Sequence, residues 1–304
     1  MKKNNKGVIL IIVLGFSLAL TFITLFFNYK INKYVDSLSI LYESLQMDRI
    51  SEVGFEIAKE IIEKDRNNYD WLEEKWNKER SFKIENYDLI IIIKDENSKI
   101  NLNKVIGEKG QSNQLLLDIL KNLFIICEYP SSLLDCLLDW IDEDNLERPF
   151  GAEYFYYSKI GLKKLPPNKN ISNLRELYLI KDYNEKILTG DKEKNKKGLL
   201  DFITIYSDDK ININTCEKEI MNAMGFTNEE VDSILSEREK KPLNETFLIK
   251  INREVFLKNK SLIKYVSNYF YVSINVKNEK GYEKIYKGIF EKNKDVRLIK
   301  KGIL

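Results

Sequence analysis

The residues best suited to chemistry are four carboxylates near the middle of the chain, Asp139, Asp142, Asp144 and Glu153. Asp139 and Asp142 stand three positions apart near the end of an apolar helical pattern, so their side chains should lie side by side on one helix. Asp144 follows where that helix should end, and Glu153 lies in the loop beyond it. Hard oxygen ligands gathered at a helix end suit calcium.

Two other interpretations account for the same carboxylates. A solvated acidic turn explains the spacing better when spacing is taken alone, because the stretch lacks the glycine and the last glutamate of an EF-hand loop. Asp139 and Asp142 could instead form the carboxylate pair of an enzyme. The chain has no histidine, nucleophile elbow or phosphate loop, so we rank an enzyme last and expect no catalytic residues.

Composition limits the kinds of partner that the chain could bind. The 304 residues carry 49 Lys and Arg against 47 Asp and Glu, and the two signs are interleaved along the chain. The body should therefore have no strong field of either sign, and we expect no nucleic-acid partner. The cysteines Cys127, Cys136 and Cys216 have no metal-binding spacing, so we interpret them as small buried residues. A Cys127–Cys136 bridge is the minority alternative.

An N-terminal helix must position the rest of the chain, including these carboxylates. Residues 8–27 contain no charge, and about twenty residues at 1.5 Å each span the hydrocarbon core of a bilayer. Three lysines precede the run, and the positive-inside rule places that end in the cytoplasm and the body outside, although Lys30 and Lys33 on the far side weaken the rule. A cleaved secretory signal is the alternative, but the small-x-small cleavage pattern is missing.

Apolar residues continue at helical spacing from Ile31 to Ile61. We predict one helix from Val8 to about Lys64, on the order of 85 Å long, with an outer half amphipathic enough to pack on a sheet. Such a helix is typical of a filament subunit. A membrane helix followed by an ordinary core helix is the alternative.

Strand patterns flank a helical middle. Residues 87–93 form a strand pattern that contains a short β-branched run at 89–93, and 269–276 alternate cleanly before a turn into 282–290. The sequence therefore predicts an α+β fold in which residues 28–99 and 266–304 form a small antiparallel sheet domain. A large helical domain over about 100–265 interrupts it.

Within the helical middle, Lys99–Asn103 and Lys210–Asn214 are a weak internal repeat. Capping-box spacing at Asn214 and Glu217, and again at Thr227 and Glu230, predicts two helices joined as a helix-hairpin-helix. A phosphate-binding hairpin is a rival interpretation, but Glu229, Glu230 and a nearby aspartate would repel a phosphate. We favour a hairpin used for packing.

The stretch Lys6-Gly7-Val8-Ile9-Leu10 resembles the prepilin peptidase site of type IV pilins and pseudopilins. The resemblance implies a leader over 1–7, cleavage between Gly7 and Val8, and methylation of the new terminus at Val8. Most of that class carry Glu at the fifth mature position, where this chain has Ile12. That departure resembles one minor type, the type II secretion system minor pseudopilin K.

Four further motifs resemble the α-domain of that family in order. They are Asp-Trp-Ile-Asp-Glu-Asp at 139–144, Gly-Ala-Glu at 151–153, Asn-Leu-Arg-Glu-Leu at 173–177 and Ile-Asn-Ile-Asn-Thr at 211–215. The resemblance implies a pilin-like domain interrupted by an α-domain that binds calcium, here through Asp139, Asp142, Asp144 and Glu153. Tyr154 stands where many relatives have another acidic residue.

The resemblance also implies a function. A family member forms the tip of the periplasmic pseudopilus and helps to initiate its assembly, so that folded proteins can cross the outer membrane. Its partners would be the minor pseudopilins I and J, other pseudopilins, the prepilin peptidase and the inner membrane. The alternative is a membrane-anchored helix-hairpin-helix protein that binds DNA in a competence or type IV pilus system.

Overall fold

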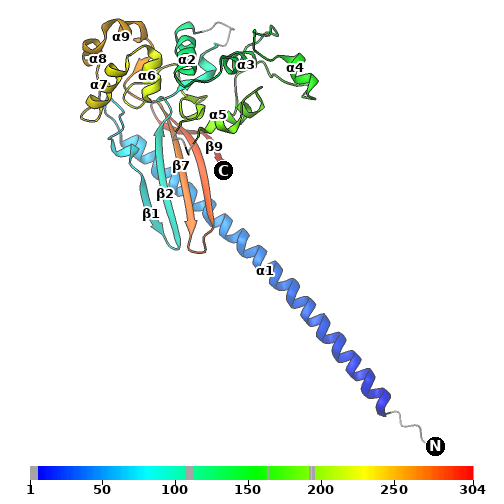
Figure 1. Cartoon of the computed structure of the whole chain (residues 1–304). Coiled ribbons are helices and arrows are strands. Elements are labelled where there is room, and N and C mark those ends of the chain that lie inside the picture. Colours follow the sequence, from blue (N-terminus) through cyan, green and yellow to red (C-terminus); the bar gives the residue numbers. More distant parts are fainter. Residues whose placement is uncertain (1–5, 107–112, 163, 192, 194–195, 304) are drawn as a thin grey trace, which may run out of the picture.

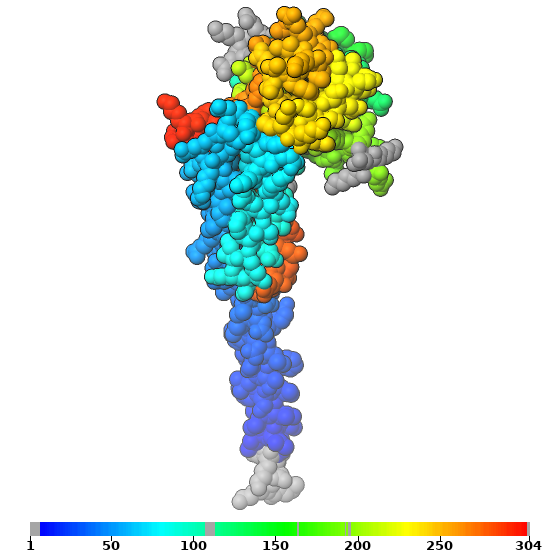
Figure 2. Space-filling view, turned by 90° about the vertical axis from the view of Figure 1, so that its left-hand side faces the viewer, coloured from blue at the N-terminus to red at the C-terminus, as the bar shows by residue number. Residues whose placement is uncertain are grey.

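The computed structural model describes residues 6–106, 113–162, 164–191, 193 and 196–303. Its longest element is α1 (Lys6–Lys64), which confirms the predicted continuous helix. Every large apolar side chain from Val8 to Leu45 is more than half exposed, and Figure 2 shows this half standing out from the body. Among the described residues α1 is the one helix long and apolar enough to cross a membrane. Residues 1–5 of the predicted leader lie outside the described part.

The second half of α1 is the spine of a sheet domain (Figure 1). Its side chains pack into one core with the sheet because they recur on one face of the helix. Gly54 lets the two surfaces approach, since a Cβ there would come within 2.9 Å of Ile274 Cγ2. The buried apolar residues of this half are Met47, Ile50, Phe55, Ala58 and Ile62.

The sheet is antiparallel throughout, with the strand order β1-β2-β7-β8-β9. The predicted strand and hairpin are confirmed as β2 (Tyr87–Asp95), β7 (Tyr269–Asn278) and β8 (Glu283–Lys292). The edge strands β1 (Arg80–Ile84) and β9 (Val296–Ile303) were not predicted. Neighbouring strands β2 and β7 are far apart in sequence, because the chain leaves the sheet between them.

The chain between β2 and β7 forms a second, mainly helical body with its own core, drawn from residues 100 to 263. Its helices are α2 (Gln114–Ile126), α3 (Ser131–Ile141), α4 (Tyr154–Lys159), α5 (Glu185–Thr189), α6 (Lys218–Met224), α7 (Asn228–Arg238), α8 (Glu245–Ile251) and α9 (Arg253–Asn259). Short 3-10 helices cover Leu102–Lys104, Leu174–Leu179 and Leu199–Asp201, and another, Lys75–Asn77, precedes β1.

The weak sequence repeat corresponds to a structural one. Each copy contributes a two-residue strand, β3 (Ile100–Asn101) or β5 (Ile211–Asn212), paired in parallel with β4 (Ile203–Thr204) or β6 (Ile263–Lys264). In both copies the asparagine side chain accepts a hydrogen bond from the backbone N–H two residues on, at 2.9 and 3.0 Å. The repeat is therefore a device for turning the chain after a short strand.

The second copy also joins the two bodies. Asp95, buried at the end of β2, accepts hydrogen bonds from Asn212 Nδ2 (3.0 Å), Thr215 Oγ1 (2.5 Å), Ser267 Oγ (2.5 Å) and the Asn97 backbone N–H (2.7 Å). Thr215 and Asn212 belong to the helical body, whereas Ser267 lies in the segment between β6 and β7 that returns to the sheet. The Asp95 carboxylate therefore links the end of β2, the repeat motif and the segment that leads into β7.

Two expectations about local structure need correction. Asn214 does not cap α6, because its side-chain oxygen accepts the Leu243 N–H at 2.7 Å instead, and α6 begins after Glu217 without a side-chain cap. All three cysteines are free, so the minority Cys127–Cys136 bridge is absent. Cys136 and Cys216 are buried as expected, whereas Cys127 is half-buried.

Candidate functional site

The predicted carboxylates surround the end of α3. Asp139 lies in its last turn, Asp142 is its C-cap, and Glu153 precedes the first turn of α4. Oxygen atoms of Asp142, Asp144 and Glu153 lie within 4.8 Å of one another. Three of the four predicted residues therefore lie close together. Sequence spacing alone could not show that the loop brings Glu153 back to the end of α3.

Asp139 has a different place. It is fully buried, and Oδ2 accepts hydrogen bonds from the backbone N–H groups of Ala152 (2.9 Å) and Arg148 (3.2 Å). Gly151 is packed against the same carboxylate, because a Cβ at residue 151 would lie 1.8 Å from Asp139 Oδ2. This carboxylate therefore holds the loop in place through hydrogen bonds, and it is not one of the three grouped carboxylates.

Arg148 is the partner that sequence reasoning missed. Its Nη1 lies 2.6 Å from Asp139 Oδ1 and 2.5 Å from Asp142 Oδ2, so one guanidinium nitrogen bridges both carboxylates. A charge-assisted pair of this kind offsets the cost of burying the carboxylates. The only sequence signal was a lone basic residue in an acidic loop, which does not reveal which acids it would meet.

The remaining oxygens are available for a ligand. Asp142 Oδ1 and both carboxyl oxygens of Glu153 are buried without a hydrogen-bond partner in the described part of the chain. Burial, and then the Asp139 and Asp142 carboxylates, raise the pKa of Glu153 to about 7. Burial likewise raises the pKa of Asp142, against the opposing pull of Arg148. Unpaired buried oxygens on two carboxyl groups, Asp142 and Glu153, with the exposed Asp144 carboxylate beside them, fit a hard cation such as calcium, which prefers oxygen ligands.

The predicted processing residues lie at the start of α1. Gly7 and Val8 are in its first turn, and a Cβ at residue 7 would meet nothing within 4 Å. Val8 is 59% exposed. No charged side chain follows until Lys30.

The predicted helix-hairpin-helix is present, and its turn packs against the helical body. Gly225 caps α6 at φ 110°, and Thr227 and Glu230 make the predicted capping box on α7. Asn259 on α9 donates to the Met224 carbonyl at 2.9 Å, and Phe226 is buried. Because the turn packs on α9 and glutamates open the next helix, a phosphate-binding role is not favoured.

The comparisons with known proteins agree with this architecture. Residues 98–190 match the protein family described as Type II secretion system (T2SS), protein K. Among solved structures, the chain is similar to GspK in the crystal structure of the GspK-GspI-GspJ complex from the enterotoxigenic Escherichia coli Type 2 Secretion System. The TM-score is 0.69 at 17% identity, over 86% of this chain and 97% of that one. No curated protein matches the sequence.

The family match covers α2, α3, α4 and α5, including all four predicted carboxylates. The structural similarity extends the likeness to most of the chain, including a sheet domain that the family match does not reach. Residues 98–190 thus match the family of type II secretion system protein K, and the chain shares its fold with GspK over 86% of its length.

Proposed function

We propose that this chain is a minor pseudopilin that forms the tip of a type II secretion pseudopilus with two other minor pseudopilins, I and J. One observation carries the proposal: a protein K domain is inserted between β2 and β7 of a sheet whose spine is a membrane-length helix. The exposed half of α1 supplies an apolar surface for neighbouring helices of a shaft. The bulky helical body would block addition of further subunits beyond it.

The test is coexpression of the full chain with the I and J proteins of the same secretion system, followed by purification in detergent. The three should elute as one complex, and deleting this chain should stop export of folded cargo. Separate elution together with normal export would contradict the proposal.

We also propose that a prepilin peptidase cleaves the Gly7–Val8 bond on the cytoplasmic side, leaving the body outside the inner membrane with a methylated terminus at Val8. The exposure of Val8 and the lysines that precede the bond support the proposal. Gly7→Phe should leave an uncleaved precursor, whereas Gly15→Phe, the same change within the apolar run, should be processed. Mass spectrometry of the mature terminus distinguishes the two, and normal cleavage of Gly7→Phe would refute the assignment.

We further propose that Asp142, Asp144 and Glu153 bind calcium. Unpaired oxygens on Asp142 and Glu153 support this site, with Arg148 holding the other oxygen of Asp142. Titration calorimetry on the full chain should show that Glu153→Gln weakens calcium binding at least about tenfold, because a charged ligand is lost. Glu147→Gln, an exposed change in the same loop, is the control. Equal affinities in both variants would refute the site.

A further inference from the structure

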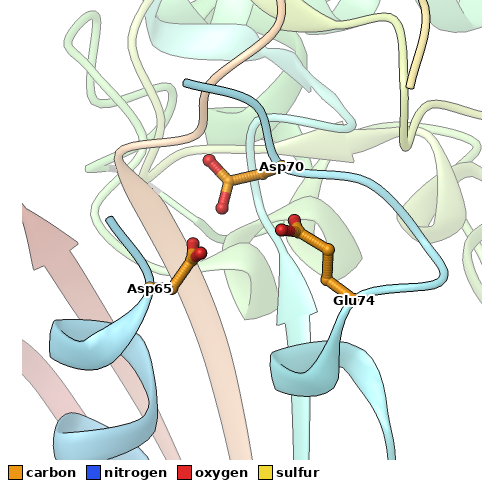
Figure 3. A group of neighbouring side chains, drawn as sticks. All are labelled: Asp65, Asp70 and Glu74. Carbon is orange, nitrogen blue, oxygen red and sulfur yellow. The ribbon is translucent and has the colours of Figure 1, made fainter. Parts of the chain in front are cut away.

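A second acidic group lies where α1 ends, outside the protein K domain match. Asp65 follows the last residue of α1, and Asp70 and Glu74 occupy the loop that leads back to β1. Oxygen atoms of the three lie within 4.8 Å of one another, and Figure 3 shows their carboxyl groups converging from three points of the chain. Two ligands at about 2.4 Å from a calcium ion are at most about 4.8 Å apart, so this spacing suits one ion.

Asp70 provides an independent indication of a ligand. The residue is 0% exposed, and Oδ2 accepts the Ser267 backbone N–H at 2.6 Å. Its other oxygen, Oδ1, has no hydrogen-bond partner in the described chain, and Figure 3 shows the Asp70 carboxyl group beside those of Asp65 and Glu74. A buried carboxylate oxygen without a donor is costly, so the site is incomplete as protein alone.

The nearby positive charge is too small to balance the group. Lys292 Nζ lies 2.8 Å from Asp65 Oδ2 and 3.8 Å from Asp70 Oδ1. One ammonium faces three carboxylates, which leaves a charge of minus two when all are ionised. Lys292 alone therefore does not balance the charge of the three carboxylates.

Three hydrogen bonds fix the position of the Glu74 carboxylate. Its Oε2 accepts the Trp71 backbone N–H and the Trp76 indole N–H, both at 2.9 Å, and its Oε1 accepts Asn67 Nδ2. These donors fix the carboxylate and leave one lone pair of Oε1 free, as outer partners do around metal ligands. Preorganisation of this kind lowers the entropy cost of binding an ion.

We propose that Asp65, Asp70 and Glu74 bind one calcium-class divalent cation at the joint between α1, the sheet and the helical body. Three carboxylates without imidazole or thiolate favour a hard cation over zinc or copper. Calcium suits the irregular arrangement better than magnesium, which demands near-ideal octahedral geometry. The ion would tie the end of α1 to the Ser267 segment that enters β7.

The test separates this ion from the calcium proposed beside α3. We would use the full chain in detergent with Asp144→Asn and Glu153→Gln, and measure bound calcium by equilibrium dialysis. One ion per chain should remain, and adding Asp70→Asn should weaken its binding at least about tenfold. Adding Glu73→Gln, which neutralises an exposed neighbour of Glu74, should leave it unchanged.

A second measurement leaves the three ligands intact, in case Asp70→Asn fails to fold. Terbium should replace calcium in the same background and emit on tryptophan excitation, because the Trp76 indole donates to Glu74. Excess calcium should quench the emission, and Trp76→Phe should reduce it without loss of binding. Absence of both calcium and terbium binding, in a background protein with native circular dichroism, would overturn the proposal. Neither measurement depends on the tip function or on the site beside α3.

Discussion

Replacing Asp95 with alanine should uncouple the sheet domain from the helical body. The change removes the acceptor of four hydrogen bonds. Asn212 Nδ2 keeps the Asp70 carbonyl (2.9 Å), and Thr215 Oγ1 keeps the Asn212 carbonyl (3.3 Å). The Asn97 N–H and the Ser267 hydroxyl have no other acceptor among the described residues.

The magnitude follows from those two groups. Each buried donor left without an acceptor costs about 1–3 kcal/mol, so the pair costs about 2–6 kcal/mol. Removing a carboxylate whose pKa is raised by burial returns part of that cost. We therefore expect a net loss of about 2–4 kcal/mol in the free energy of unfolding.

Two tryptophans make the uncoupling measurable. Trp76 is buried in the sheet core and Trp140 in the helical core, so single-tryptophan proteins report on each body separately. In urea, the two reporters should unfold together in the parent and at separate midpoints in Asp95→Ala. Asp88→Ala, an exposed change on the same strand, should stay within about 0.5 kcal/mol of the parent. The reasoning fails if Asp95→Ala unfolds like Asp88→Ala with coincident reporters.

Three further changes test other contacts. Gly54→Leu should destabilise the sheet domain by about 1–3 kcal/mol in urea unfolding, because even a Cβ would press on Ile274, whereas Gly302→Leu meets open space. Gly151→Ala should cost about 1–3 kcal/mol by displacing the Asp139 carboxylate, and an unchanged midpoint would contradict that packing. Lys280, Tyr87 and Asn278 lower the pKa of Glu43 from 4.5 to about 2, so its stabilisation is present above pH 4.5 and lost as the pH falls towards 2. The Tm difference between parent and Glu43→Gln should therefore be largest near pH 7 and shrink by pH 3, and a pH-independent difference would exclude this contribution.

The sequence alone determined the elements whose periodicity is long and regular. The uncharged run and its helical continuation fixed α1, because a helix and a bilayer each impose one repeat length on apolar residues. Alternation over 269–276 predicted β7 for the same reason. The sequence did not predict the edge strand β1, because its residues Arg80–Ile84 are too little buried to require an alternating pattern.

Only the tertiary structure decided how individual polar side chains pair. Asn214 has the spacing of a helix cap, yet its oxygen is taken by Leu243 from a distant segment. Asp139 resembles its neighbours in sequence, yet Arg148 and Ala152 enclose it and leave Asp142 and Glu153 with the unpaired oxygens. Hydrogen-bond partners brought together by chain folding are not encoded in local spacing, because burial and distance, rather than residue type, determine which donors a carboxylate meets.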